Sequence, residues 1–229
     1  MIISGLLKTT LLDYPSHVAA TVFLGGCNLR CPFCHNSSFL EHPAEEYTLE
    51  ELFSFLRKRQ GILDGVCISG GEPSLNPELP EFIKEIKSLG YLIKLDTNGT
   101  NPDMLKNLIE NCLLDYVAMD VKSSFNEYEK CCGCSVNLPA ISRSVSLLME
   151  GRVPYEFRTT ITEELHTAAA MKSMGEMLQG AEQLFLQSFV DSDGVAVKNL
   201  HAPSIEQLKE YKEILQHYIS NVFIRGVEE

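Results

Sequence analysis

Three cysteines in one short run are the residues whose types and spacing most clearly support chemistry. Cys27 and Cys31 lie four positions apart, and Cys34 follows three positions later. Three thiolates at this spacing, with no fourth in the run, can hold a cubane iron–sulfur cluster by three of its four irons. The fourth iron would stay open to a ligand that is not protein. Ferredoxins that only carry electrons close all four corners with cysteine, so the run predicts a catalytic cluster.

Two other uses of these cysteines fit their spacing less well. A zinc site usually pairs two separated Cys or Cys/His elements, although His35 directly after the run could complete a Cys3His set. A disulfide framework is typical of small secreted chains, which this chain of 229 residues does not resemble. The iron–sulfur interpretation is therefore preferred, and zinc stays open as the alternative.

The composition indicates a reduced, soluble protein of the cytoplasm. The sequence begins with no signal segment and has no run of 18 or more apolar residues, so we expect no membrane association. A length of 229 residues suffices for one sizeable core, which predicts a single domain over 1–229. The formal net charge of −12 argues against a nucleic-acid partner, because phosphate backbones are bound by clusters of Lys and Arg. Protein or small-molecule substrates fit better.

Short runs rich in Val, Ile, Phe and Tyr alternate with stretches of helical spacing along the chain. The runs predict strands at 18–24, 66–69, 91–96, 116–121, 155–161 and 184–190. The stretches predict helices at 48–60, 78–89, 103–111, 138–150, 164–178 and 204–218, the first opened by a Thr48-x-x-Glu51 capping box. Six βα units in series specify a parallel sheet that is covered by helices.

The fold class that this alternation predicts is α/β, as an incomplete (β/α)6 barrel of parallel strands with outer helices. A closed barrel of eight units typically needs about 250 residues, so this chain is slightly short for one. A flat doubly wound sheet is the alternative fold. In both folds the chemistry sits at the carboxyl ends of the strands, so functional residues are expected in the loops there.

Polar motifs follow several of these strands. Gly70-Gly71-Glu72-Pro73 comes after the second strand, where the glycines permit close backbone approach and the carboxylate can receive an ammonium group. Asp96 and Asp120 end the third and fourth strands, although a loop cap would explain either one alone about equally well. Arg158 lies within the fifth strand, where an arginine facing a barrel interior needs an anionic partner.

The cysteine run, the motifs at 70–73 and 96–99 and the Asp120/Lys122 pair together resemble the radical S-adenosylmethionine superfamily. The resemblance spans nearly the whole chain. Within the superfamily, the segments at 12–15, 23–28 and 34–36 resemble the enzymes that activate glycyl-radical enzymes. The closest likeness is to the activating proteins of anaerobic ribonucleoside-triphosphate reductase, with pyruvate formate-lyase activating enzyme as a near relative.

The resemblance implies a 4Fe-4S cluster that binds S-adenosylmethionine at its open iron and cleaves it reductively to a 5′-deoxyadenosyl radical. That radical would take a hydrogen atom from a backbone glycine of a partner enzyme, and a flavodoxin or ferredoxin-type protein would supply the electron. Two other classes remain open. One is a radical enzyme acting on a small molecule, such as the 7-carboxy-7-deazaguanine synthase type, and the other is a non-catalytic iron–sulfur electron carrier.

The resemblance also assigns roles around the cluster by position. Cys27, Cys31 and Cys34 would be its ligands and the catalytic residues, with Phe33 as a shield. The methionine amino group of the cofactor would be received by the segment comprising Gly70, Gly71 and Glu72.

Further cofactor contacts are expected at or near strand ends, at Asp96, Thr97, Asn98, Asp120, Lys122, Arg158 and Gln187. Asp96 and Asp120 resemble carboxylates that hold a monovalent cation beside the cofactor. Lys122 and Arg158 are expected on its carboxylate or ribose side. Gln187 is assigned on its position at the end of the sixth strand alone.

The remaining cysteines, histidines and methionines are expected to be structural. Cys131-Cys132-Gly133-Cys134 resembles a second metal site, but two adjacent cysteines cannot easily point at one metal. Buried packing positions are expected for Cys67 and Cys112. No spacing typical of a metal site links the histidines at 17, 42, 166 and 201, and the methionines at 171, 174 and 177 predict a core stripe.

Overall fold

One curved sheet of eight strands organises the computed structural model, which describes residues 1–40 and 44–227. The strands follow one another across the sheet in chain order: β1 (Ile3–Thr10), β2 (Ala19–Leu24), β3 (Gly65–Gly70), β4 (Leu92–Thr97), β5 (Tyr116–Asp120), β6 (Tyr155–Ile161), β7 (Gln183–Ser188) and β8 (Asn221–Arg225). β1 runs antiparallel to β2, and every other neighbouring pair is parallel.

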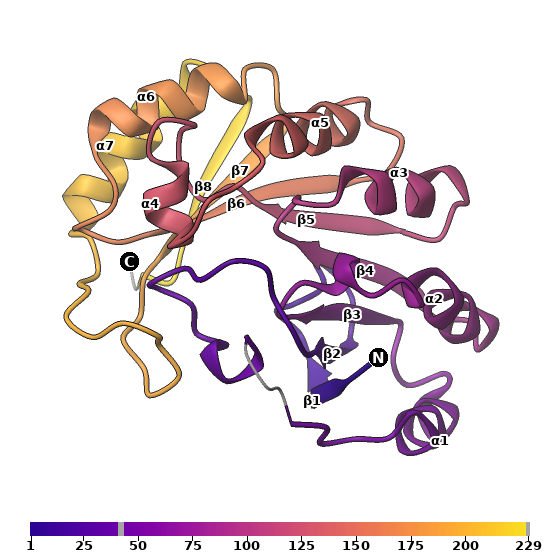
Figure 1. Cartoon of the computed structure of the whole chain (residues 1–229). Coiled ribbons are helices and arrows are strands. Elements are labelled where there is room, and N and C mark those ends of the chain that lie inside the picture. The colour runs from indigo at the N-terminus through magenta and orange to yellow at the C-terminus, as the bar shows by residue number, and fades with distance from the viewer. Residues whose placement is uncertain (41–43, 228–229) are drawn as a thin grey trace.

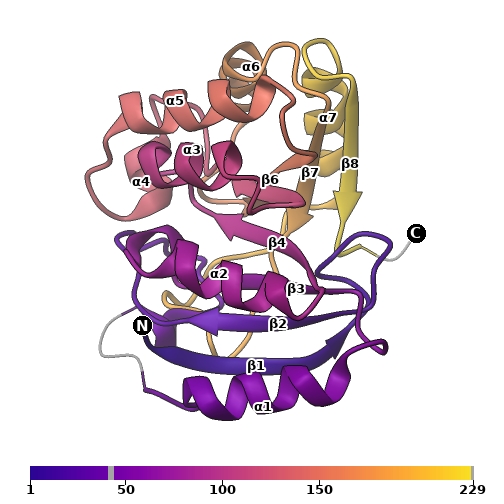
Figure 2. The same ribbon diagram turned by 90° about the vertical axis from the view of Figure 1, so that its right-hand side faces the viewer.

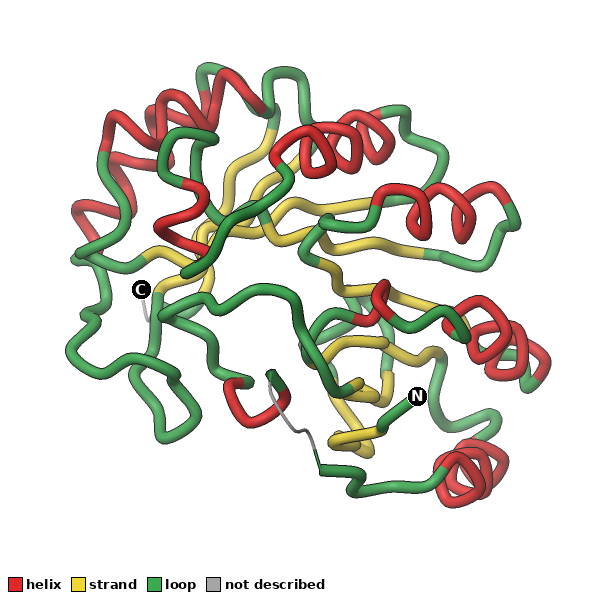
Figure 3. The backbone as a smooth tube through the Cα atoms, in the orientation of Figure 1, coloured by secondary structure: helices red, strands yellow, loops and turns green. Residues whose placement is uncertain are grey.

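The helices are α1 (Leu49–Arg59), α2 (Leu79–Ser88), α3 (Pro102–Glu110), α4 (Tyr128–Cys132), α5 (Leu138–Met149), α6 (Ala168–Met177) and α7 (Ile205–Gln216). Two short 3-10 turns add Ser37–Phe39 and Pro73–Leu75. All of these helices except α4 lie along the outer side of the sheet, whose strands curve around the centre of the molecule (Figures 1 and 2). The short helix α4 packs against the cysteine loop, where the Arg30 N–H donates to the Cys132 carbonyl. Figure 3 separates the yellow strands inside from the red helices outside. This confirms the predicted α/β partial barrel.

Six βα units run from β2 to α7, as the alternation of the sequence predicts. The capping box at α1 is present, with Thr48 Oγ1 accepting from the Glu51 N–H and the Glu51 carboxylate accepting from the Thr48 N–H. The helix predicted over 164–178 begins only at Ala168, because the Thr167 side chain caps it by accepting from the Ala170 N–H.

The sequence does not predict β1, β8 or α4. Polar residues interrupt β1, which reads ISGLLKTT and lies at one edge of the sheet. Five residues make up β8 and five make up α4, so neither is long enough to show a clear periodicity. Within residues 1–40 and 44–227, no helix combines the length and apolar character needed to cross a membrane.

The two faces of the sheet differ in composition. On β4, Ile93 and Leu95 are fully buried and belong to the main hydrophobic core, whereas Lys94 and Asp96 alternate with them. Because successive side chains of a strand point to opposite faces, the apolar set lies against the helices and the charged set faces the interior of the partial barrel. The interior is thus polar, and the strand ends above it form the site described next.

Candidate active site

A cavity of about 420 Å³ lies at the carboxyl ends of the strands, where the loops of the partial barrel converge. Every site residue that the sequence predicts lines it: Cys27, Cys31, Phe33, Cys34, Gly70, Gly71, Glu72, Asp96, Thr97, Asn98, Asp120, Lys122, Arg158 and Gln187. Segments that are up to 160 positions apart in the sequence therefore meet around one space. Their individual roles remain predictions.

The three cysteines of the run lie on the loop after β2. The backbone holds this loop in place, with the Cys34 N–H donating to the Cys31 carbonyl (3.0 Å) and the Arg30 N–H donating to the Cys132 carbonyl (2.8 Å). Burial raises the pKa of Cys27 to about 11. A cysteine must lose its proton to ligate a metal, so cluster binding would have to overcome this shift.

The arrangement of the thiols favours a cluster over zinc. Tetrahedral zinc with ligands about 2.3 Å away would bring its sulfurs to within roughly 4 Å of one another. Among the described residues, the only three metal-ligating groups that lie within 4.8 Å of one another are Glu163, Glu164 and His201, so Cys27, Cys31 and Cys34 are more widely spaced. His35 does not complete a zinc set either, because its Nε2 lies 2.7 Å from the Val190 carbonyl and its ring stacks on Phe189.

Two glycines let the chain pass close to the cysteine loop. Gly70 has φ +118°, and a Cβ there would lie 2.3 Å from the Leu24 carbonyl oxygen. A Cβ on Gly71 would lie 2.1 Å from the Gly26 carbonyl oxygen. Glycine is therefore required at both positions, and the absence of side chains keeps backbone groups accessible at the cavity wall.

The Glu72 carboxylate is buried and joins two loops. Its Oε1 accepts from the Ser74 N–H (3.1 Å), the Ser74 hydroxyl and the Thr97 hydroxyl (2.7 Å), and its Oε2 accepts from the Asn98 N–H (2.6 Å). Burial raises the pKa of Glu72, and these hydrogen bonds oppose the shift. Only Oε2 keeps clear capacity for another donor, so Glu72 fixes the β3 and β4 loops whether or not it also meets the cofactor.

Asp96 and Asp120 are tied together by Arg158. The Arg158 Nε donates to Asp120 Oδ1 (3.0 Å) and its Nη1 donates to Asp96 Oδ2 (3.3 Å). Lys94 pairs with Asp96, and Lys122 pairs with Asp120 at 3.0 Å. Burial alone would raise the pKa of Asp120, but Arg158 and Lys122 outweigh it and hold the pKa at about 2.

This network bears on the predicted monovalent cation, which stays a prediction. The guanidinium of Arg158 lies between the two carboxylates, and three protein cations accompany two carboxylates. Both carboxylates are therefore already paired with protein cations.

Phe33 is buried beneath the cysteine loop, with Lys122 Nζ 5.8 Å from the centre of its ring. Thr97 and Asn98 follow β4 and adjoin the cysteine loop, where the Asn98 side-chain amide donates to Asn28 Oδ1 (3.0 Å). Gln187 lines the cavity from the end of β7. The structure thus places Phe33, Thr97, Asn98 and Gln187 around the cavity, and their contacts with the cofactor stay predictions.

Seven residues beyond the predicted site residues also line the cavity: Asp13, Leu29, His35, Asn36, Leu40, Ser69 and Thr160. Asp13 and Asn36 lie in the segments 12–15 and 34–36, which carry the family resemblance. Thr160 follows Arg158 by two positions and so shares its face of β6. Because residues two positions apart in a strand share a face, the position of Arg158 could have predicted that Thr160 also faces the cavity.

The other five cysteines do not line the cavity. Cys131 and Cys132 are buried in the core, and Cys134 donates weakly to the Asn28 carbonyl. Cys132 Sγ hydrogen-bonds to Cys31, a contact that lowers the pKa of Cys31 to about 7 against the effect of burial. Cys67 is buried as predicted, but the prediction for Cys112 is wrong. Cys112 is exposed in the turn that ends α3 with φ +54°.

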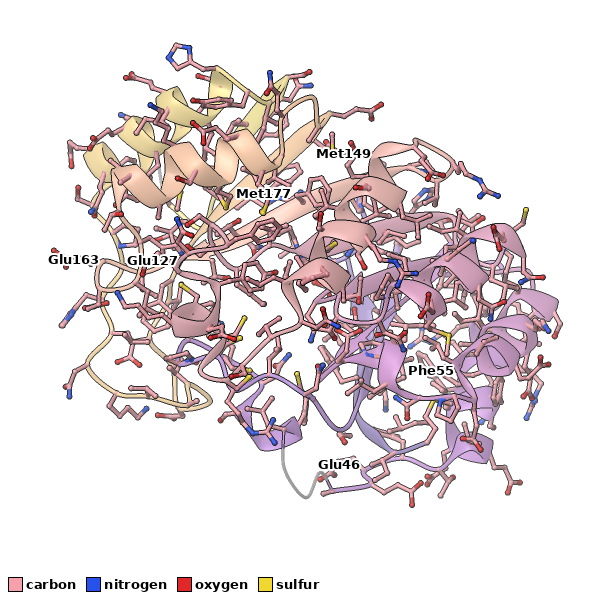
Figure 4. The ribbon with its side chains drawn as sticks, turned by 45° about the horizontal axis from the view of Figure 1, so that its top comes forward. Glu46, Phe55, Glu127, Met149, Glu163 and Met177 are labelled. Atoms are coloured by element: carbon pink, nitrogen blue, oxygen red, sulfur yellow. The ribbon has the colours of Figure 1, made fainter. Side chains whose placement is uncertain are left out.

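The histidines and methionines follow most of their predictions. His166 is buried, with Nδ1 accepting from the Thr162 N–H and Nε2 near the Lys122 carbonyl, and His42 lies outside the described residues. His201 lies beside Glu163 and Glu164 in an exposed group that contains no second histidine, with Glu163 at the periphery in Figure 4. Met171 and Met174 are fully buried, and Met177 packs beside them against the core (Figure 4).

A model of the radical SAM superfamily matches residues 21–161, which include the cysteine loop and the strand ends up to β6. The chain belongs to the radical SAM superfamily. Membership implies a 4Fe-4S cluster and S-adenosylmethionine, and the cavity fits them. Three thiols and two glycines that cannot carry side chains line one wall, and among the described residues no fourth cysteine lines it.

Relatives within the superfamily point to more than one activity. A Methanocaldococcus jannaschii protein provisionally named a glycyl-radical enzyme activating enzyme is 33% identical over 99% of this chain and 96% of its own length. Pyruvate formate-lyase-activating enzyme of Clostridium pasteurianum is 33% identical over 53% of this chain and 52% of its own. The 7-carboxy-7-deazaguanine synthase of Haemophilus influenzae is 31% identical over 58% of this chain and 55% of its own.

Solved structures confirm the fold. SuiB of Streptococcus suis superimposes with a TM-score of 0.70 at 14% identity, over 91% of this chain and 49% of that one. At this identity the likeness extends to the architecture alone. The partial barrel is therefore shared with a protein about twice the length of this chain.

Proposed function

We propose that this radical SAM protein activates a glycyl-radical enzyme, and that its partner is an anaerobic ribonucleoside-triphosphate reductase. The observation that carries the activating function is the likeness to the Methanocaldococcus jannaschii relative over nearly the full length of both chains. The cavity supports the chemistry, because three thiols and a polar interior surround one space. The choice of reductase rests on the sequence motifs at 12–15, 23–28 and 34–36.

Cys27, Cys31 and Cys34 would hold the cluster, each at one iron. When bound and reduced, the group would supply the one electron that the reductive cleavage of S-adenosylmethionine to methionine and a 5′-deoxyadenosyl radical needs, and that radical would take the glycine hydrogen atom, giving 5′-deoxyadenosine and a glycyl radical on the partner. The electron would come from a cytoplasmic flavodoxin or ferredoxin-type protein.

The remaining residues would position the cofactor. The backbone around Gly70 and Gly71 would receive the methionine amino group, since no side chain covers it there. Lys122 and Arg158 would attract the methionine carboxylate, because these two cationic side chains line the cavity. Phe33 would exclude water from the cluster side of the cavity.

Two alternative functions are supported by relatives that match about half of this chain. The pyruvate formate-lyase-activating enzyme and the 7-carboxy-7-deazaguanine synthase match similar shares of this chain at similar identity. The former would change only the partner. The latter would replace a protein glycine by a small molecule in the same cavity.

The test is to reconstitute the cluster anaerobically, reduce it, add S-adenosylmethionine and the reductase encoded in the same genome, and record the EPR spectrum. We expect a glycyl doublet on the reductase. Cys31→Ala should abolish it, whereas Cys112→Ala should not, because Cys112 is exposed and lies outside the cavity. Formation of 5′-deoxyadenosine without any doublet would contradict this partner and favour a different substrate.

A further inference from the structure

The strand β8 is an open edge of the sheet. It pairs with β7 on one side, and in the part of the chain that the structure describes no strand pairs with its other side. The opposite edge differs, because the Ile3 carbonyl of β1 accepts from the N–H groups of Glu46 and Tyr47. An open edge presents N–H and C=O groups that can bind an extended peptide as an added strand.

A groove of about 640 Å³ runs where β8 meets α7. Six residues line it, which we call the β8–α7 groove: Ile205, Lys209, Lys212, Phe223, Ile224 and Val227. Phe223 is 43% exposed although it is a large apolar side chain. The groove therefore combines an apolar floor with a strand edge that can form hydrogen bonds.

The two lysines of the groove have no carboxylate partner among the described residues. Lys209 and Lys212 are nevertheless adjacent on one helix of a chain whose net charge is −12. Two unpaired cations beside an apolar floor complement a segment that carries acidic as well as apolar side chains. Nucleic acid fits less well, because the rest of the chain would repel phosphate.

The Phe223 side chain lies on the face of β8 that leads toward the cavity. The Phe223 ring stacks on Phe185 with 4.9 Å between the ring centres, and the Arg225 guanidinium lies 3.4 Å from the centre of the Phe185 ring. Arg225 is in turn paired with the buried Glu156 through two hydrogen bonds. In the strand register Arg225 lies beside Gln187, which lines the cavity.

From these features we infer that the β8–α7 groove binds the glycine-bearing polypeptide of the partner as an extended segment added along β8. The inference rests on the proposed function. A glycine has no side chain that a partner could recognise. Recognition must therefore use the backbone of the segment and the side chains that flank the glycine. The strand edge supplies backbone hydrogen bonds, Phe223 contacts an apolar neighbour, and Lys209 and Lys212 contact acidic ones.

The first test measures the apparent KM for the purified glycyl-radical enzyme of the same genome, from the rate of doublet formation. Lys209→Glu with Lys212→Glu should raise it at least tenfold, and more at low salt than at high salt. Lys172→Glu on the exposed side of α6 is the matched control and should leave it unchanged. Phe223→Ala should also raise it, and formation of 5′-deoxyadenosine without partner reports whether each variant is folded.

In the second test, Phe223 is replaced by the photocrosslinking residue p-benzoylphenylalanine, and crosslinks to the partner are mapped after irradiation. We expect crosslinks within the partner segment that contains the target glycine. An unchanged KM in the lysine variant, or crosslinks only between copies of this chain, would overturn the inference that the β8–α7 groove binds the partner. The wild-type doublet would in that case still support the activating function. Absence of the wild-type doublet would instead overturn the proposed function, and this inference with it.

Discussion

The two faces of the sheet show how one set of strands can supply stability on one side and a reactive site on the other. Outward residues such as Ile68, Ile93 and Leu95 are fully buried against the helices. The inward residues that alternate with them include Lys94, Asp96 and Arg158, which form ion pairs across the interior. A closed eight-unit barrel fills its interior with branched apolar side chains, so the charged interior here marks space kept for a polar ligand.

The comparison also separates two kinds of energy. Burial on the outer face is favourable by itself, at roughly 25 cal/mol per Å² of apolar surface. Burying charges on the inner face costs free energy that ion pairing and hydrogen bonds only offset. Stability should therefore depend on the outer face through side-chain volume and on the inner face through intact pairing.

The largest effect should follow from breaking the inner network. Arg158→Met removes the group that joins Asp96 to Asp120 and should lower the free energy of unfolding by about 4 kcal/mol, measured by urea denaturation. The matched control is Arg152→Met, whose exposed pair with Glu110 should contribute less than about 1 kcal/mol. Equal losses of unfolding free energy in the two variants would mean that the inner ion pairs contribute no more to stability than an exposed pair.

A smaller effect is expected from substituting Glu72, whose carboxylate joins the loops after β3 and β4. Glu72→Gln turns one of the two carboxylate acceptors into a donor, which then faces the Thr97 hydroxyl if it replaces Oε1 or the Asn98 N–H if it replaces Oε2, so the β4 loop should shift. The dissociation constant of S-adenosylmethionine, from equilibrium dialysis with the reconstituted protein, should rise about tenfold, or about 1.4 kcal/mol. Glu81→Gln, at an exposed position, serves as the control. An unchanged dissociation constant for Glu72→Gln would show that this loop does not contribute to S-adenosylmethionine binding.

The outer face should respond to volume alone. Ile68→Val deletes one methylene from a fully buried side chain and should cost about 1 kcal/mol of unfolding free energy, while the S-adenosylmethionine dissociation constant stays within twofold. Ile62→Val, at an exposed position, should change neither quantity. A large loss of affinity in Ile68→Val would show that the two faces are not independent.

The smallest effect should appear with pH at His166. Burial lowers the pKa of His166 below its ordinary value of about 6.5, so the unfolded state binds a proton more readily than the folded state. Stability should consequently fall as the pH drops through 6.5 toward the folded pKa. The melting temperature of wild type should decrease between pH 7 and pH 5, and His166→Gln should flatten that decrease. Parallel pH profiles would contradict this assignment.

Much of this arrangement could be predicted from the sequence, for physical reasons. Parallel strands buried on one face by helices leave strong apolar runs, and the carboxyl ends of those strands must meet at one edge of the sheet. That logic gathers Gly70, Asp96 and Asp120 with the cysteine loop before any coordinates are known. The structure indeed places them around one cavity.

The rest depends on contacts between segments distant in the sequence. No local pattern tells that Glu72 accepts from Thr97 and Asn98, 25 and 26 positions away. Lys94 reads as an ordinary charged residue within a strand until its partner Asp96 and its burial are known. The short edge strand β8 carries too few residues to reveal its period, although it defines the groove with α7.

The central claim is that Cys27, Cys31 and Cys34 hold a cluster whose open iron meets S-adenosylmethionine in the polar interior. The direct measurement is the EPR spectrum of the reduced, reconstituted protein before and after S-adenosylmethionine is added. We predict a changed spectrum, because the cofactor binds the cluster itself. A spectrum indifferent to S-adenosylmethionine would mean a closed cluster that only carries electrons, and would contradict the account.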